Sequence, residues 1–289
     1  MTTIAFLGLG NMGGPMAANL VKAGHVLHGF DPMPEAVKAA QENGIETFPT
    51  AVEAVASAQV VITMLPNGGI VKQCYDEIIP ASSTGTLFID SSTISVADAR
   101  DIHQRAADAG LAQVDAPVSG GVKGATAGTL AFMVGGTEAA FAAARTMLEP
   151  MAGKIIHCGD TGAGQAAKVC NNMLLAVQQI AVGEAFVLAE KLGLSDQALY
   201  DVVTGATGNC WAIETNCPVP GPQPGSPANN EFTPGFATAL MNKDLGLAMD
   251  AVGDTGARAP LGTHAAQLYR AFAEQHASLD FSAIIETLR

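Results

Sequence analysis

The first half of the chain alternates short apolar runs with longer stretches of helical periodicity. Apolar runs that favour buried strands occupy residues 3–9, 26–30, 60–65, 87–90, 111–115, 130–134 and 154–157. Between them, apolar residues recur at helical spacing over residues 16–23, 95–109 and 137–147. Strands that alternate with helices in this way are typical of βαβ units. The pattern therefore predicts a parallel sheet covered by helices, with Ser95 as the N-cap of the second helix.

After Gly164 the strand pattern ends. Residues 165–191 have the length of a single helix of about 40 Å, and shorter helical patterns cover residues 195–203, 236–254, 260–274 and 282–288. Ser195 is the expected cap of the first of these shorter helices. The proline-rich stretch 216–235 predicts a long loop. We therefore expect an α/β domain at residues 1–162 and an all-α domain at residues 163–289, built on one long interdomain helix.

The long helix is apolar on nearly every side. A helix of that kind must be buried all round, and one small domain can hardly cover it. We therefore expect a second subunit to cover part of it, in a homodimer or a homotetramer. Gln178, Gln179 and Glu184 interrupt its most apolar stretch, which argues against a membrane crossing of about 20 apolar residues.

A glycine motif follows the first predicted strand directly. Gly8, Gly10 and Gly13 have the GxGxxG spacing between a strand and a helix, and Asp31 closes the second strand. In this context the glycines allow a tight turn, a close approach of the backbone to a pyrophosphate, and close packing of helix on strand. A carboxylate at Asp31 can accept the ribose hydroxyls and would repel a 2′-phosphate. The motif predicts a Rossmann-type domain that binds NAD rather than NADP, although Asp31 could also serve in a turn before Pro32.

Polar and small residues stand at the ends of the other predicted strands. They include Leu65-Pro66, Ser91 to Thr93, and Ser119 with Gly120 and Gly121. In parallel sheets ligands gather at the carboxyl ends of the strands, so these segments should share one crevice. Thr93 could hydrogen-bond a ribose or cap the next helix. Ser119 to Gly121 could bind a carboxylate through backbone N–H groups or form an ordinary glycine turn.

One lysine stands out at the beginning of the long apolar helix. Lys168 and Asn172 are four residues apart and share a helical face. A lone lysine on a helix is commonly a solvated charge, but the apolar surroundings favour a buried one. Burial or a nearby cation moves a lysine pKa toward neutrality, where an amine can act as a general base. Lys243 and Asp244 form a second pair of interest, which could equally be an exposed ion pair.

Composition narrows the possible partners. The formal net charge of −13 over 289 residues argues against nucleic acid and against anionic membranes. The five cysteines form no CxxC pair, so neither a disulfide framework nor a zinc site is expected and we expect no metal. The sequence begins in a strand-like run without a basic or apolar leader pattern. We expect a cytoplasmic protein.

Taken together, these motifs resemble the β-hydroxyacid dehydrogenases, and most closely the 3-hydroxyisobutyrate dehydrogenases. The resemblance covers the whole chain. It rests on Phe6 to Gly13, on Asp115 to Gly121, on the GxGxxxKxxNN pattern from Gly162 to Asn172, and on Lys243-Asp244-Leu245. It implies metal-free oxidation of a 3-hydroxy acid to its semialdehyde with NAD, as in valine breakdown. Related enzymes for tartronate semialdehyde, serine or 4-hydroxybutyrate stay open, as does a nucleotide-binding assembly module without catalysis.

The resemblance also implies roles for single residues. The catalytic lysine corresponds to Lys168 and its helper amide to Asn172. The substrate carboxylate is bound by Ser119, Gly120 and Gly121, and Lys243 lies near substrate and cofactor. Cofactor contacts are implied for Gly8, Gly10, Asn11, Met12, Gly13, Asp31, Leu65, Pro66 and Thr93.

Overall fold

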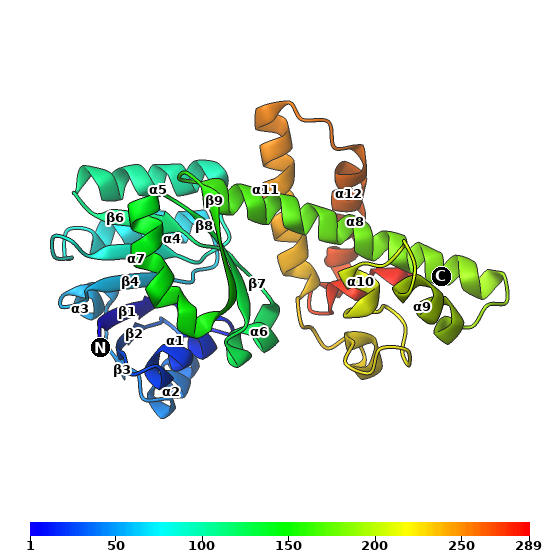
Figure 1. Cartoon of the computed structure of the whole chain (residues 1–289), viewed down its shortest axis with the longest axis horizontal. Coiled ribbons are helices and arrows are strands. Elements are labelled where there is room, and N and C mark those ends of the chain that lie inside the picture. Colours follow the sequence, from blue (N-terminus) through cyan, green and yellow to red (C-terminus); the bar gives the residue numbers. More distant parts are fainter. The chain divides into compact units, whose positions relative to one another are not determined.

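The computed structural model describes residues 1–289 and divides into two compact units, Met1–Lys168 (unit 1) and Val169–Arg289 (unit 2). Unit 1 contains every strand, and unit 2 is helical (Figure 1). The division falls inside the longest helix, α8 (Ala163–Lys191). The expected combination of a Rossmann-type α/β part with an all-α part built on one long helix is confirmed.

Unit 1 is organised around one sheet with the strand order β3-β2-β1-β4-β5-β6-β8-β7, in which β9 also pairs with β8. From β3 across to β6 all neighbouring strands are parallel. The chain runs from β1 outward to β3 and then returns to β4 on the other side of β1, which creates a topological switch point between β1 and β4. The strands are β1 (Thr3–Leu7), β2 (Val26–Phe30), β3 (Glu46–Thr47), β4 (Val60–Thr63), β5 (Leu87–Asp90), β6 (Ala112–Asp115), β7 (Val118–Ser119), β8 (Leu130–Gly135) and β9 (Ala152–Gly159).

The edge of the sheet beyond β6 departs from the expected parallel arrangement. β8 runs antiparallel to β6 and β7 and parallel to β9. The parallel arrangement that the alternating pattern predicts therefore ends at β6. Hydrophobic periodicity reports which residues are buried and carries no information on the direction of a strand.

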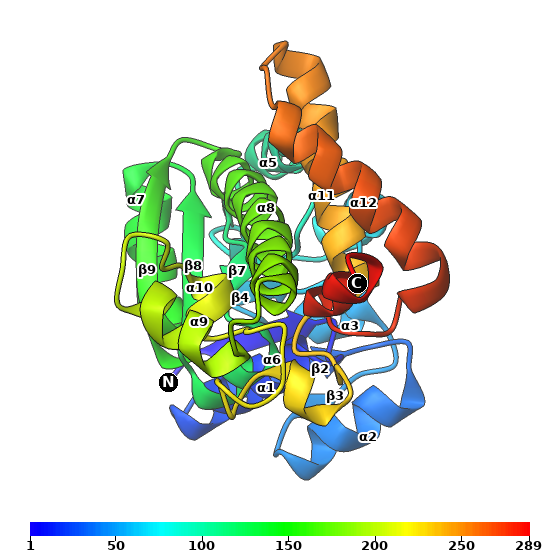
Figure 2. The ribbon, with the colours of Figure 1, turned by 90° about the vertical axis from the view of Figure 1, so that its right-hand side faces the viewer.

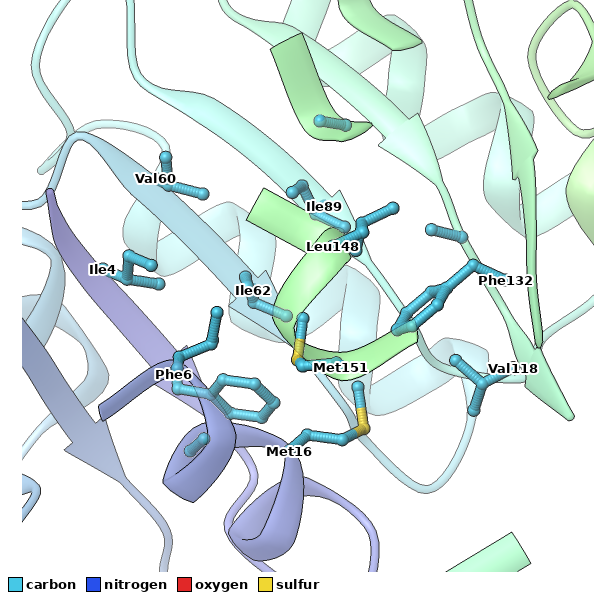
Figure 3. Packing of buried hydrophobic residues seen from close by; sticks show 14 of the residues in the cluster. Ile4, Phe6, Met16, Val60, Ile62, Ile89, Val118, Phe132, Leu148 and Met151 are labelled. Carbon is cyan, nitrogen blue, oxygen red and sulfur yellow. The ribbon is translucent and has the colours of Figure 1, made fainter. Parts of the chain in front are cut away.

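Helices cover both faces of the sheet, which explains why its central strands are apolar throughout. On one face Ile4, Phe6 and Ile62 pack with Met16 and Leu148 (Figure 3). The alternate residues of the strands pack on the other face against α3, α4 and α5. The helices of unit 1 are α1 (Gly13–Lys22), α2 (Pro34–Glu42), α3 (Ala51–Val55), α4 (Gly68–Ile78), α5 (Val96–Asp108), α6 (Gly121–Ala127) and α7 (Glu138–Leu148), followed by a 3-10 turn η1 (Glu149–Met151).

Local sequence determines where the main helices begin. Ser95 caps α5 by accepting a hydrogen bond from the backbone N–H of Asp98 at 2.9 Å, as expected. Thr137 caps α7 in the same way. The hydrophobic pattern of the sequence does not predict α2, α3 and α4. In α2 only Ala40 is buried, so this helix has few of the apolar residues by which helices are recognised.

Unit 2 is built from α8 and four further helices, with no strand. The helices α11 and α12 pack against each other and lie side by side in Figure 2. Ser195 caps α9 through the N–H of Ala198 at 3.3 Å, as expected. The elements are α9 (Asp196–Thr204), α10 (Trp211–Glu214), η2 (Pro227–Asn230), α11 (Thr238–Thr255), α12 (Pro260–His276) and η3 (Phe281–Thr287), of which η2 and η3 are 3-10 helices.

The long helix α8 is buried on one side only. Ala176, Ile180 and Phe186 are buried, whereas Leu174 is 56% and Leu188 is 60% exposed. As expected, one chain does not cover this helix on every side, because α8 carries more apolar surface than the rest of unit 2 can cover. By length and composition alone α8 could cross a membrane, but the core helix of a soluble protein meets the same test.

The proline-rich segment is fixed to the end of the chain by one buried carboxylate. Asp280 accepts hydrogen bonds from the side chain of Asn216 at 3.1 Å and from the backbone N–H groups of Gly235 and Phe236 at 3.0 Å. It also accepts hydrogen bonds from the N–H and the hydroxyl of Ser282. Both ends of the segment are therefore attached to the residues that follow α12.

Candidate functional site

The glycine motif connects β1 to α1, and its glycines meet different demands. Gly8 has a φ of +93°, and a side chain there would overlap the carbonyl oxygen of Met64. A side chain at Gly13 would overlap the carbonyl oxygen of Gly8. At Gly10, in contrast, a Cβ atom would meet nothing within 4 Å. Gly8 and Gly13 are thus required by the fold, whereas the open space at Gly10 fits a ligand that approaches the backbone.

Asp31 lies beside this loop at the end of β2. Its Oδ2 accepts a hydrogen bond from the N–H of Leu9 at 2.7 Å, and its Oδ1 accepts one from the N–H of Met33 at 2.8 Å. The carboxylate therefore serves in the turn around Pro32 and supports the glycine loop at once. It remains partly exposed, so its free lone pairs can still accept hydroxyl groups.

The loops after β4 and β5 are joined to each other. The backbone N–H of Leu65 donates to the hydroxyl of Ser92 at 2.8 Å. Pro66 is exposed and Thr93 partly exposed, so both residues are accessible to a ligand. Ser95 and not Thr93 caps the next helix, so the capping alternative for Thr93 is wrong.

A buried acid lies beneath these two loops. Asp90 accepts hydrogen bonds through Oδ1 from the hydroxyl of Thr63 at 2.7 Å and from the N–H of Ser92 at 3.1 Å. Its Oδ2 has no hydrogen-bond partner. Burial raises the pKa of Asp90 from 3.8 to about 6, against the lowering effect of its bonds to Ser92 and Thr63. Asp90 thus supports the loop of Ser92 from below at a cost in desolvation.

The beginning of α8 is attached to the end of β6. Gly162 has a φ of +84°, as expected for a sharp turn before the helix. The side chain of Asp115 accepts hydrogen bonds from the N–H of Gly162 at 2.7 Å and from that of Gln165 at 2.8 Å. A carboxylate at a helix N-terminus satisfies free N–H groups and complements the helix dipole. Lys168 follows on the same helix and is only 7% exposed, so it is not a solvated surface charge.

Ser119 is the last residue of β7, and Gly120 and Gly121 lead from it into the short helix α6. Gly120 has a φ of +134° and Gly121 of +60°, which side chains rarely adopt. The glycines do form a turn, as one of the two alternatives proposed, but this turn continues directly into α6. α6 packs beside α1, where the side chain of Asn19 donates to the carbonyl of Ala125 at 2.7 Å.

Unit 2 contributes a buried polar cluster around Asp244. The side-chain amide of Asn172 donates to Oδ2 of Asp244 at 2.6 Å, and the ammonium of Lys243 lies 3.3 Å from its Oδ1. Asn171 donates to the amide oxygen of Asn172 at 3.0 Å. Asp244 is 3% exposed, so the alternative of an exposed ion pair with Lys243 is wrong.

Most of the residues suggested by the sequence therefore fall into two groups. Unit 1 brings together the glycine loop with Asn11 and Met12, Asp31, Leu65, Pro66 and Thr93 at the carboxyl ends of parallel strands. Unit 2 brings together Asn172 and Lys243 through Asp244. Lys168 lies on α8, four residues before Asn172. Pattern analysis did not assign roles to Asp90, Asp115 or Gln165, because only their long-range hydrogen bonds distinguish them.

The switch point, the glycine loop and Asp31 define unit 1 as a dinucleotide-binding domain. Comparison with family models agrees: residues 3–159 match the NAD binding domain of 6-phosphogluconate dehydrogenase. Residues 162–288 match a second model, described as the NAD-binding domain of NADP-dependent 3-hydroxyisobutyrate dehydrogenase. The protein is thus of the nicotinamide-dependent dehydrogenase class.

Individual relatives specify the family. A probable 3-hydroxyisobutyrate dehydrogenase of Mycobacterium tuberculosis is 71% identical over 289 residues, which cover all of this chain and 98% of that protein. The solved structure of M. tuberculosis 3-hydroxyisobutyrate dehydrogenase with L-serine superposes with a TM-score of 0.97 at 70% identity, covering 100% of this chain and 99% of the other. The chain belongs to the 3-hydroxyisobutyrate dehydrogenase family.

Two proteins of Pseudomonas aeruginosa are also similar. One is named 3-hydroxyisobutyrate dehydrogenase and is 47% identical, with 100% of this chain and 99% of that protein covered. The other is named NAD-dependent L-serine dehydrogenase and is 44% identical, with 98% and 97% covered. Overall identity hardly separates these two, so the choice between their substrates has to come from the site.

Proposed function

We propose that this protein oxidises 3-hydroxyisobutyrate to methylmalonate semialdehyde with NAD⁺, as a step of valine breakdown. The observation that carries the proposal is the location of Lys168. It is a buried lysine on a helix whose N-terminus is attached, through Asp115, to the sheet edge where the dinucleotide would bind.

The cofactor residues of the proposal are those of the glycine loop, Asp31, Leu65, Pro66 and Thr93. The open space at Gly10 supports a close approach of the pyrophosphate. Asp31 supports NAD over NADP, since its carboxylate would repel a 2′-phosphate. The bound dinucleotide supplies the hydride acceptor, at C4 of its nicotinamide.

The remaining chemistry belongs to side chains of this protein. Lys168 takes the proton of the substrate hydroxyl while the hydrogen on the carbinol carbon leaves with its bonding electron pair as hydride. In the reverse direction Lys168 returns the proton. Asn172 helps to hold the substrate, and its amide is oriented by Asp244. The N–H groups and the hydroxyl of Ser119 to Gly121 bind the substrate carboxylate, and Lys243 adds a positive charge.

L-serine is the second candidate substrate. It too is a 3-hydroxy acid, with an amino group where 3-hydroxyisobutyrate has a methyl group. The observation that favours it is the solved structure of the 70% identical relative, which was determined with L-serine. The same residues would perform the same oxidation on it, so the two substrates compete as candidates for one site.

We further propose a cytoplasmic homo-oligomer with functional domains at residues 1–162 and 163–289. The exposed leucines at positions 174 and 188 of α8 support a subunit contact. All five cysteines are free, in keeping with a reducing compartment. Light scattering of the purified protein measures the number of subunits, and a monomer at micromolar concentration would contradict the proposal.

The test is a panel of steady-state rates. We expect 3-hydroxyisobutyrate with NAD⁺ to give the highest kcat/KM among 3-hydroxyisobutyrate, L-serine, glycerate (the alcohol that corresponds to tartronate semialdehyde) and 4-hydroxybutyrate, each measured with NAD⁺ and NADP⁺. Lys168→Ala should lower kcat by at least about 10²-fold, the lower end of the usual contribution of acid–base catalysis, while NADH still binds. Near-normal turnover by that variant would refute the role of Lys168. NADH binding without turnover of any hydroxy acid would favour the assembly module instead.

A further inference from the structure

The side chain of Gln165 connects α8 to the loop after β5. Its amide nitrogen donates to the carbonyl of Ser92 at 2.7 Å, and its amide oxygen accepts from the N–H of Ile94 at 3.2 Å. Gln165 is 0% exposed. Both polar atoms of a fully buried amide are therefore used on two backbone groups 73 and 71 residues away.

These two backbone groups flank Thr93 on either side. A donor toward Ser92 and an acceptor toward Ile94 are both needed, and a carboxamide supplies both in one plane. The backbone of Thr93 is therefore clamped from both directions. In the proposed function Thr93 contacts the cofactor, so the clamp acts on a loop that faces the nicotinamide end of the site.

The other end of the clamp is equally well fixed. The backbone N–H of Gln165 donates to Asp115, which holds the first turn of α8 against β6. Lys168 lies three residues further along α8, about one helical turn from Gln165. Gln165 thus links the turn preceding Lys168 directly to the loop of Thr93.

We propose that Gln165 is a positioning residue, which sets the distance between the proton acceptor Lys168 and the cofactor loop at Thr93. This inference rests on the proposed function. Hydride and proton leave the same carbinol group, so acceptor and base must be held in a constant relation to each other. A misplacement of about 1 Å can reduce a rate by about 10²-fold.

Two substitutions test this role. Gln165→Met keeps the length of the side chain and removes both hydrogen bonds. Gln165→Glu keeps the acceptor for Ile94 and loses the donor for Ser92 while the introduced carboxyl is ionised. Gln178→Met is the matched control, because Gln178 lies on the same helix, is partly exposed and makes no such bonds.

For Gln165→Met we expect kcat to fall by about 10- to 10²-fold and the KM for the hydroxy acid to change less. The deuterium isotope effect on kcat, measured with substrate deuterated at the carbinol carbon, should increase because hydride transfer becomes slower. A loss of folded enzyme would lower kcat without raising the isotope effect. The dissociation constant of NADH, from its fluorescence, should rise by about 3- to 10-fold as the Thr93 loop loosens.

For Gln165→Glu the activity relative to wild type should increase as the pH is lowered from 8 to 6, because the protonated carboxyl regains a donor for the Ser92 carbonyl. Values of kcat, isotope effect and NADH affinity within twofold of those of Gln178→Met, for both substitutions, would overturn the inference. If the wild type turns over no hydroxy acid, the proposed function falls and the NADH affinities alone decide on Gln165.

Discussion

Replacing Asp90 by asparagine should stabilise unit 1 at pH 8 and have little effect near pH 4. Asp90 is 1% exposed, and burial raises its pKa from 3.8 to about 6. An asparagine retains an oxygen for the donors Thr63 and Ser92 and removes the buried charge. It places an amide where Oδ2 now has no partner.

The sign follows from proton binding. Between pH 4 and 6 the folded protein holds the proton of Asp90 more tightly than the unfolded chain, so the free energy of unfolding decreases as the pH rises through this window. Above pH 6 the destabilisation is complete. The pKa of Asp90 in the folded protein and in the unfolded chain differs by about 2, which corresponds to a destabilisation of about 3 kcal/mol at high pH. At pH 5 the destabilisation is about half of this value.

Thermal unfolding of the protein without cofactor measures this effect. For a domain of this size 1 kcal/mol corresponds to about 2–4 °C in Tm. Asp90→Asn should therefore raise Tm by about 6–12 °C at pH 8 and by about half as much at pH 5. The control is Asp108→Asn, on the exposed end of α5, which should show no such dependence on pH. A lower Tm for Asp90→Asn at pH 8, or an equal gain at both pH values, would refute the reasoning.

Three further substitutions test the binding loop and the cluster of unit 2. Gly10→Ala introduces a Cβ into open space, so Tm should stay within about 2 °C of the wild-type value. The dissociation constant of NADH, measured by fluorescence titration, should rise at least about tenfold. Unchanged affinity would show that Gly10 is not in contact with the cofactor. Gly13→Ala, whose Cβ would overlap the carbonyl oxygen of Gly8, should lower Tm as well, by several degrees in the same thermal scan. Asp244→Ala leaves the buried amide of Asn172 without its acceptor, which typically costs about 1–3 kcal/mol. We expect kcat to fall at least about tenfold in steady-state assays. A wild-type kcat would mean that the orientation of Asn172 by Asp244 is irrelevant to catalysis.

The parts of the fold that could be predicted from the sequence are those with a local signal. The strands β1, β2 and β5 follow from apolar runs, and the starts of α5 and α9 follow from the caps Ser95 and Ser195. The helices α2 to α4 and the direction of β8 could not be predicted. α2 buries only Ala40 and α3 has only five residues, so both offer few positions from which a helical period can be detected, and burial does not encode strand direction.

In the candidate site, too, only the residues with a local sequence signal could be predicted. Glycine spacing and the position of Lys168 are visible locally. The roles of Asp115, Gln165 and Asp244 depend on hydrogen bonds between residues about 50 to 73 positions apart. A single sequence does not reveal such pairs, because an aspartate or glutamine in an apolar region has the same appearance with any partner. The side chains that orient the site are therefore harder to find than those that act in it.

The attachment of the proline-rich segment to Asp280 has a consequence for biosynthesis. Asp280 lies 45 residues after Gly235 in the sequence and holds Asn216, Gly235 and Phe236 in place. Residues 1–168, which form a compact unit, can fold while the ribosome is still making the rest. Unit 2 can fix its longest loop in place only after Asp280 has left the ribosome. An enzyme truncated before Asp280 would therefore retain a folded unit 1 beside an incomplete helical unit.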